Sequence, residues 1–240
     1  MTSSELKTCA RKLMVDNSPK LFFVSVFFVA IITVLTELNY RLPGIEGAYI
    51  RYMEFISAGT PHSIRLLLSQ LAPVGLALAA LLLLMTVIIQ VGFFSYCIKT
   101  KRSLNADIKD IFNGFLFLGK VLLILILSSI LIALWTLLFF FPGVVAYYKY
   151  CQAYYIMLDD PNKSAIQCLR ESKLLMKGNK LDLFLIDLSF IGWFFLSVLF
   201  TLLMLQFIPF PLPIVSIWLA PYLGLSRATY YSHLLDKLAV

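Results

Sequence analysis

Asp187, Arg227 and Lys149 are ionisable residues that stand well inside apolar stretches of the 240-residue chain. An isolated charge deep in a membrane span costs about 2.5–3.5 kcal/mol, so such residues usually pair inside a bundle or line a functional cavity. Asp187 lies about 9 Å beyond the expected cytosolic start of its stretch, and Arg227 lies at a similar depth in the next one. This match predicts an ion pair, with Lys149 as a second candidate partner of Asp187. We favour a packing lock over a polar cavity that binds a ligand or relays ions, because pumps and carriers usually contain more intramembrane acids.

The composition predicts that these residues lie in a membrane protein. Hydrophobic residues make up 60% of the chain and charged residues 14%, against about 45–50% and about 25% in soluble domains. A helix needs about 20 apolar residues to cross a bilayer. Six apolar stretches occur, of which the fourth is short, at 21–38, 72–98, 116–141, 144–158, 181–207 and 212–232. We therefore expect an all-α, polytopic helical membrane protein with about six transmembrane helices in one integral membrane domain, 1–240.

The basic residues orient these spans. Only Arg41, Arg51 and Arg65 fall in the expected outer loop 39–70, where three glutamates match them. Six spans with both termini inside place the other basic segments in the cytosol, as the positive-inside rule requires, whereas five spans would put one segment outside. The cytosolic basic residues are Lys7, Arg11, Lys12, Lys20, Lys99, Lys101, Arg102, Lys109, Lys120, Lys163, Arg170, Lys173, Lys177 and Lys180. The expected location is the bacterial cytoplasmic membrane.

Each cytosolic segment also shows the apolar periodicity of an amphipathic helix lying at the membrane surface. The apolar faces comprise Leu6, Cys9, Ala10, Leu13 and Met14 before the first span; Leu104, Ile108, Ile111, Phe112 and Phe115 before the third; and Ala165, Cys168, Leu169, Ser172, Leu175 and Met176 before the fifth. One such helix followed by two spans therefore recurs in repeat-like units at 3–98, 103–158 and 162–232. The pattern suggests a threefold internal repeat.

The last of these basic helices carries its own start and stop signals. Ser164 or Asn162 could cap its amino terminus. Gly178 is placed to end it as the C′ residue, where a left-handed backbone favours glycine. Asn179 and Lys180 then mark the return into the membrane.

Catalytic, cofactor and metal motifs are absent from the sequence. It contains no nucleophile elbow, zinc-binding helix motif, phosphate-binding loop or dinucleotide fingerprint. Its histidines, His62 in a polar outer turn and His233, do not form a metal cluster, and its four cysteines lack zinc or disulfide spacing. We interpret Asp159 and Asp160 as a negative lead-in to the following helix rather than a metal site. We expect no enzyme activity, no cofactor and no nucleic-acid partner.

Tyrosines crowd the short fourth span, and the sixth adds Tyr222, Tyr230 and Tyr231. They either pack with buried hydroxyl bonds or line an aromatic groove for a lipid tail or apolar peptide, with Lys149 near an acidic headgroup. The groove candidates are Tyr147, Tyr148, Tyr150, Tyr154, Tyr155 and Tyr222.

Three long runs carry a family resemblance: PGVVAYYKYCQAYYIMLDDP, SAIQCLRESKLLMKGNKLDLFLIDLSFIGWFF and APYLGLSRATYY. They resemble the DUF975 family, integral membrane proteins found mainly in Firmicutes and related Gram-positive bacteria. The resemblance is strong over about the last hundred residues, whereas DNSPK near the amino terminus departs from the expected glycine-asparagine corner. It implies a polytopic bacterial inner-membrane protein without an established activity and transfers no catalytic residue.

These features favour a non-enzymatic membrane protein that binds anionic lipid or assists another membrane protein. The candidates for lipid headgroup contacts are Arg170, Lys173, Lys177, Lys7, Arg11, Lys101 and Arg102. One alternative is self-protection against a membrane-active peptide such as a bacteriocin, which the outer loop 39–70 could contact. A small carrier is a weaker alternative because its support is limited to Asp187, Arg227 and Lys149. The sequence does not define the oligomeric state.

Overall fold

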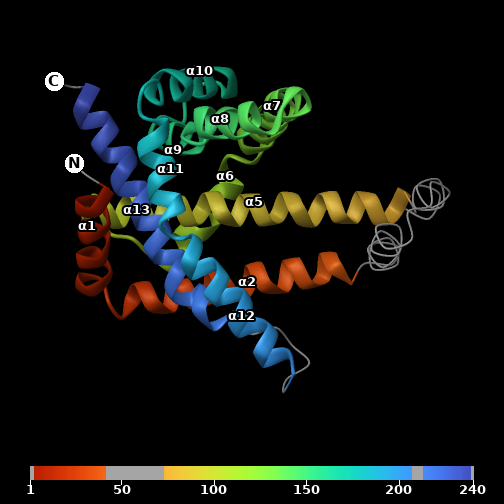
Figure 1. Cartoon of the computed structure of the whole chain (residues 1–240), viewed down its shortest axis with the longest axis vertical. Coiled ribbons are helices and arrows are strands. Elements are labelled where there is room, and N and C mark those ends of the chain that lie inside the picture. The colour runs from red at the N-terminus through yellow and green to blue at the C-terminus, as the bar shows by residue number, and fades with distance from the viewer. Residues whose placement is uncertain (1–2, 42–72, 207–212, 239–240) are drawn as a thin grey trace. The chain divides into compact units, whose positions relative to one another are not determined.

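The computed structural model of the chain describes residues 3–41, 73–206 and 213–238. Helices make up the regular structure of these ranges, which confirms the all-α prediction (Figure 1). They are α1 Ser3–Asp16, α2 Lys20–Tyr40, α5 Pro73–Lys101, the 3₁₀ helix η1 Ile108–Phe112, α6 Asn113–Leu116, α7 Leu118–Leu138, α8 Phe140–Tyr150, α9 Ala153–Asp159, α10 Ala165–Leu175, α11 Lys180–Leu188, α12 Ile191–Leu205 and α13 Ile214–Leu238.

Four stretches of described helix are long and apolar enough to cross a membrane by length and composition: Lys20–Tyr40, Ala77–Lys101, Leu118–Leu138 and Lys180–Met204. These helices identify a membrane protein. The short fourth stretch, 144–158, falls in α8 and α9, which are separated at Cys151 and Gln152. The count of six spans and the threefold repeat stay predictions. Most of the expected outer loop, with His62, lies outside the described residues.

The chain divides into two compact units, and each is described by itself. The second unit, residues 30–87, contains the end of α2 and the beginning of α5. In it Arg41 and Glu37 form an exposed ion pair one helical turn apart, with the Nε and Oε2 atoms 3.4 Å apart. The first unit combines residues 1–29 with 88–240 and holds every site considered below.

Within the first unit, α13 and α7 each anchor a group of helices. The α13 helix packs against α1, α11 and α12, so the two ends of the chain lie side by side (Figure 1). The α7 helix packs against α8, and α10 covers α7, α8 and α9. The first helix, α1, thus packs directly on the last helix, α13.

Two of the three expected amphipathic helices are present. Leu6 and Ala10 of α1 are buried, and α1 packs on α13. The whole predicted face of α10 is buried, and Ser164 rather than Asn162 caps the helix in a capping box with Gln167. Both apolar faces therefore pack on protein, which leaves the basic faces outward. Gly178 has a left-handed φ of 82°, as predicted, but it lies two residues beyond the cap residue Met176 and is therefore the C″ residue rather than the predicted C′ residue.

The prediction of an amphipathic helix over residues 104–115 is wrong. Residues 104–107 are not helical, and only η1 and the single-turn α6 follow. The physical reason is local capping: the Asp107 side chain accepts from the Ile108 N–H, and Asp110 accepts in return from the Asp107 N–H. Asp110 also pairs with Lys99 at the end of α5. Periodicity missed this turn because short polar side chains compete with the helical ladder.

Two glycines allow this turn to lie directly on α5. A methyl group at Gly92 would overlap the backbone oxygen of Ile111, and one at Gly114 would overlap the backbone oxygen of Ile88. Both residues are buried. The absent side chains therefore let the two backbones touch, which ties residues 108–116 to α5.

Candidate functional site

Asp187 and Arg227 lie in direct contact, as the matched depth predicted. Arg227 Nε donates to Asp187 Oδ1 at 3.1 Å, and Nη2 donates to Oδ2 at 2.8 Å. The Tyr148 hydroxyl adds a third bond to Oδ2 at 3.1 Å. The side chains are only 21% exposed for Arg227 and 15% for Asp187. A bidentate pair with a further donor satisfies this carboxylate internally, and it joins α8, α11 and α13.

Lys149 does not join this pair. Its ammonium lies over the rings of Trp135 and Tyr150, 5.9 and 5.2 Å from their centroids. It lines a cavity of about 360 Å³ whose lining also includes Lys180, Phe141, Pro142, Val145 and Ala146. The structure therefore assigns Lys149 to a different, aromatic environment.

A second polar cluster was missed by the sequence argument. Asp159, at the end of α9, accepts two bonds from Arg102 at 2.8 and 2.9 Å and one from the Tyr231 hydroxyl at 2.8 Å. The bond to Asp159 raises the pKa of the Arg102 guanidinium. The expected lead-in role is therefore wrong for Asp159, which instead links the ends of α9 and α5 to Tyr231 within α13. Among the described residues no group of three metal-binding side chains occurs.

The candidate tyrosines lie in different surroundings rather than along one groove. Tyr148 and Tyr155 are buried; Tyr148 bonds Asp187, and Tyr155 stacks on Phe94 and Tyr231 with centroids 5.0 and 5.3 Å away. Tyr147 is exposed, and Tyr150 and Tyr154 are half-buried. Of these six, Tyr222 lines the cavity that contains Arg11. Packing with a buried hydroxyl bond fits Tyr148, whereas the Tyr155 hydroxyl is buried without a hydrogen-bond partner among the described residues.

The basic residues predicted to contact lipid headgroups also lie in different surroundings. Arg170, Lys173 and Lys177 are exposed around α10. Lys101 approaches the Cys9 sulfur, with a distance of 3.6 Å between Nζ and Sγ, and Lys7 lies 5.1 Å above the Phe190 ring. Burial lowers the pKa of Lys7. With Arg102 bound to Asp159, the free cations of this set are the three on α10 and Arg11.

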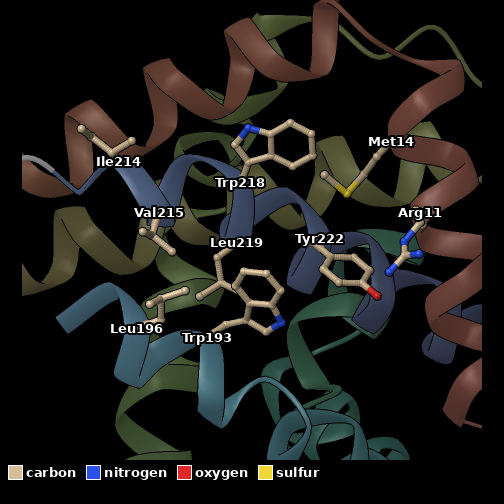
Figure 2. A pocket seen from close by; sticks show the side chains of 9 residues that line it. All are labelled: Arg11, Met14, Trp193, Leu196, Ile214, Val215, Trp218, Leu219 and Tyr222. Atoms are coloured by element: carbon tan, nitrogen blue, oxygen red, sulfur yellow. The ribbon is translucent and has the colours of Figure 1, made fainter. Parts of the chain in front are cut away.

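Arg11 stands at a cavity of about 450 Å³ formed by α1, α12 and α13, and its lining is mostly apolar and aromatic. The lining residues are Arg11, Met14, Trp193, Leu196, Ile214, Val215, Trp218, Leu219 and Tyr222. Figure 2 shows Arg11 and the Tyr222 hydroxyl toward one end of this cavity and the aliphatic side chains of Leu196, Ile214 and Val215 toward the other. The cavity is therefore amphipathic along its length.

Arg11 has no hydrogen-bond or ion-pair partner within the described part of the chain, and its side chain is exposed. A guanidinium presents a planar fork of donors that matches phosphate and carboxylate groups. An unpaired guanidinium beside an apolar cavity suits an amphiphile with an anionic head. Arg11 and Tyr222 were among the residues predicted from the sequence, but Trp193 and Trp218 were not. The only sequence signal for these tryptophans is that Trp218 lies one helical turn before Tyr222.

Comparison with known proteins gives a family match for the carboxy-terminal part of the chain. Residues 140–237 match the sequence model of a family described as a protein of unknown function (DUF975). Over these residues the chain is similar to the DUF975 family. The DUF975 region runs from α8 into the last turn of α13, so it contains Asp187, Arg227 and Tyr148 together. No curated protein and no solved structure matches the chain.

Arg11 lies outside the DUF975 region, whereas Trp193, Trp218 and Tyr222 lie inside it. The cavity is thus completed by α1, a helix that the family match does not include. The ion pair, by contrast, is contained wholly within the matched residues.

Proposed function

We propose that this protein binds an anionic phospholipid, without catalysing a reaction, in the bacterial cytoplasmic membrane. In this proposal the chain crosses the membrane several times and both termini lie in the cytosol. This is the orientation that the positive-inside rule gives for the basic segments. Lipid held in this way would let the protein act as a membrane factor for another membrane protein. The membrane character follows from the apolar helices, and the ligand follows from the chemistry of Arg11.

The observation that carries the proposal is that Arg11, which has no hydrogen-bond or ion-pair partner among the described residues, lines one end of an aromatic cavity. Arg11 is exposed, so its guanidinium is accessible to a lipid phosphate, and hydrogen bonds between guanidinium and phosphate are charge-assisted. Trp and Tyr side chains are enriched where lipid headgroups meet acyl chains, and this cavity supplies Trp193, Trp218 and Tyr222. Its volume is within the usual range of ligand sites, about 300–1,000 Å³.

The exposed face of α10 supports the same ligand class. Arg170, Lys173 and Lys177 are unburied, and basic residues close to an anionic surface contribute about 1 kcal/mol each. The apolar face of α10 is buried against α7, α8 and α9, so these cations face outward. They would attract anionic lipid generally, whereas Arg11 would hold one molecule.

The immunity alternative rests on the outer loop, of which residues 42–72 lie outside the described structure. The carrier alternative rests on Asp187, whose carboxylate is satisfied by Arg227 and Tyr148. Neither gains a specific observation from the residues that the structure describes. The lipid proposal is therefore the one that the geometry favours.

Native mass spectrometry of gently extracted protein tests the proposal. The wild-type protein is expected to retain one phosphatidylglycerol or cardiolipin through detergent exchange. Arg11→Gln should lose it, because the charge-assisted bonds to phosphate are removed.

Lys12→Gln is the matched control, since Lys12 is the neighbouring cation on α1, is exposed and lines neither the cavity nor its rim. This variant should retain the lipid. Equal retention by Arg11→Gln and the wild type would contradict the proposal, as would exclusive retention of a zwitterionic lipid or a peptide.

A further inference from the structure

A second apolar cavity adjoins the first and shares its cation. It has a volume of about 340 Å³ and is formed by α1, the start of α2 and α13. Its lining includes Phe22, Phe23, Ile217 and Pro221, and it shares Arg11, Met14 and Trp218 with the first cavity. The Arg11 side chain therefore lines both cavities.

The positions along α13 explain why there are two hollows rather than one. At about 100° per residue, Ile217 and Pro221 fall to one side of Trp218, and Leu219 and Tyr222 fall to the other. Ile214, in the first turn of α13, falls on the Ile217 side but lines the first cavity. Trp218 is 67% exposed, so its indole stands out from the helix between the two sides. The ring acts as a partition, and Arg11 lies at both compartments.

We propose that the ligand is a two-chain anionic phospholipid that straddles Trp218, with one acyl chain in each cavity and its phosphate on Arg11. This inference rests on the proposed function and specifies its ligand class. One headgroup joined to two chains matches one cation shared by two apolar compartments. A single-chain amphiphile would fill one compartment and leave the other without an occupant.

The surroundings of Arg11 fit a phosphate rather than a larger acidic group. Lys7 lies one turn before Arg11 on α1, and its ammonium is held over Phe190, whose ring meets Tyr222 edge-on with centroids 4.9 Å apart. Tyr222 itself lines the first cavity. A hydroxyl donor and a second positive charge thus lie on the Tyr222 side of the site. This side suits the headgroup, and the partition at Trp218 suits the chains.

Quenching of tryptophan fluorescence by brominated acyl chains distinguishes one chain from two. The protein used is the full chain carrying Trp135→Phe, which leaves Trp193 and Trp218, both of which line the first cavity. The probes are phosphatidylglycerol with two brominated chains, its lyso form with one, and two-chain phosphatidylcholine. Because each buried methylene strengthens binding about fourfold, two-chain phosphatidylglycerol should quench at least about tenfold more tightly than the lyso form.

Two variants that fill one compartment each sharpen the test. Val215→Phe narrows the first cavity and Ile217→Phe the second, while Val198→Phe adds the same ring at an exposed α12 position that lines neither. The first two should reduce two-chain affinity to about that of the lyso form and leave lyso binding within about twofold. Val198→Phe should change neither. Competition between the two lipids on wild-type protein, followed by native mass spectrometry, gives the comparison without any substitution.

The outcomes separate the two proposals. Equal affinity for the two-chain and lyso forms, both above phosphatidylcholine, overturns the straddling arrangement and leaves anionic lipid binding intact. Equal affinity for phosphatidylglycerol and phosphatidylcholine overturns both. Loss of lyso binding in both filled variants also contradicts two separate compartments.

Discussion

Arg227 and Arg11 lie in the same part of the first unit, on α13 and on the helix packed against it, but their surroundings differ. Arg227 makes two hydrogen bonds to Asp187, which also accepts from Tyr148. Arg11 has no such partner among the described residues and faces two apolar cavities. The first charge is satisfied by the fold, whereas the second is exposed and available to a partner from outside. The difference separates a residue placed to stabilise the protein from one that we propose binds a ligand.

The largest expected effect is at the satisfied pair. Asp187→Asn strands the Arg227 guanidinium in a site where it is 21% exposed, and breaking a buried pair costs about 3–5 kcal/mol. The melting temperature in detergent should therefore fall clearly, as measured by differential scanning fluorimetry. Asp182→Asn, an exposed acid on the same helix, is the control and should have little effect.

The double variant Asp187→Asn/Arg227→Gln shows whether the loss comes from the contact. It should recover much of the stability, because neither charge then remains stranded, and contacting residues give such non-additive results. Simple addition of the two single losses would mean that the residues do not share a contact. Survival of stability in all three variants, with loss of a transport or resistance phenotype, would make this pair functional instead.

An intermediate effect is expected at the cluster around Asp159. Asp159→Asn weakens the bonds from Arg102 and Tyr231, but the Arg102 side chain is 39% exposed, so water can replace part of the loss. We expect a destabilisation of about 1 kcal/mol, as is usual for partly exposed pairs. The same thermal assay measures it, with the adjacent Asp160→Asn as control. A loss as large as that of Asp187→Asn would show that this cluster is the principal lock.

A smaller effect on stability is expected from the exposed cations of α10. Replacing Arg170, Lys173 and Lys177 with glutamine should change the free energy of unfolding by less than about 0.5 kcal/mol. The amount of loosely co-purifying anionic lipid should fall, because each cation near the surface contributes about 1 kcal/mol. Lipid analysis of the extract measures this fall, and the single tightly held lipid should persist. If that lipid disappears as well, its site includes α10.

The smallest expected change in stability is that of Arg11→Gln. In micelles free of phospholipid, the free energy of unfolding should differ from wild type by less than about 0.5 kcal/mol, because no described contact is removed. Added phosphatidylglycerol should then stabilise the wild type and not the variant. Destabilisation of the lipid-free variant would reveal an internal partner for Arg11 and remove the contrast with Arg227.

The sequence predicted the ion pair because the cost of an isolated charge limits where an acid and a base can lie in neighbouring spans. It also predicted α10, whose apolar periodicity and capping signals agree. It missed the bond between Arg102 and Asp159, which are 57 positions apart, because that contact depends on how whole helices pack. The segment after Ser103 failed for a local reason: the Asp107 and Asp110 side chains cap a 3₁₀ turn.

The cavity at Arg11 was beyond sequence reasoning for a related reason. Arg11 was recognised as a basic residue near a membrane surface, and Tyr222 as a tyrosine available for a groove. Neither pattern showed that α1 would pack on α13 and bring the two together with Trp193 and Trp218. A cavity is a property of the space between elements, and periodicity describes one element at a time.

Photocrosslinking tests the central claim most directly. Protein reconstituted with phosphatidylglycerol that carries a diazirine on its acyl chains is irradiated, and adducts are mapped by peptide mass spectrometry. We predict adducts concentrated on peptides containing Met14, Leu196 and Trp218, abolished by Arg11→Gln and preserved in Lys12→Gln. Adducts spread evenly over exposed apolar helices such as α7, with the same distribution in Arg11→Gln, would contradict a lipid site at Arg11.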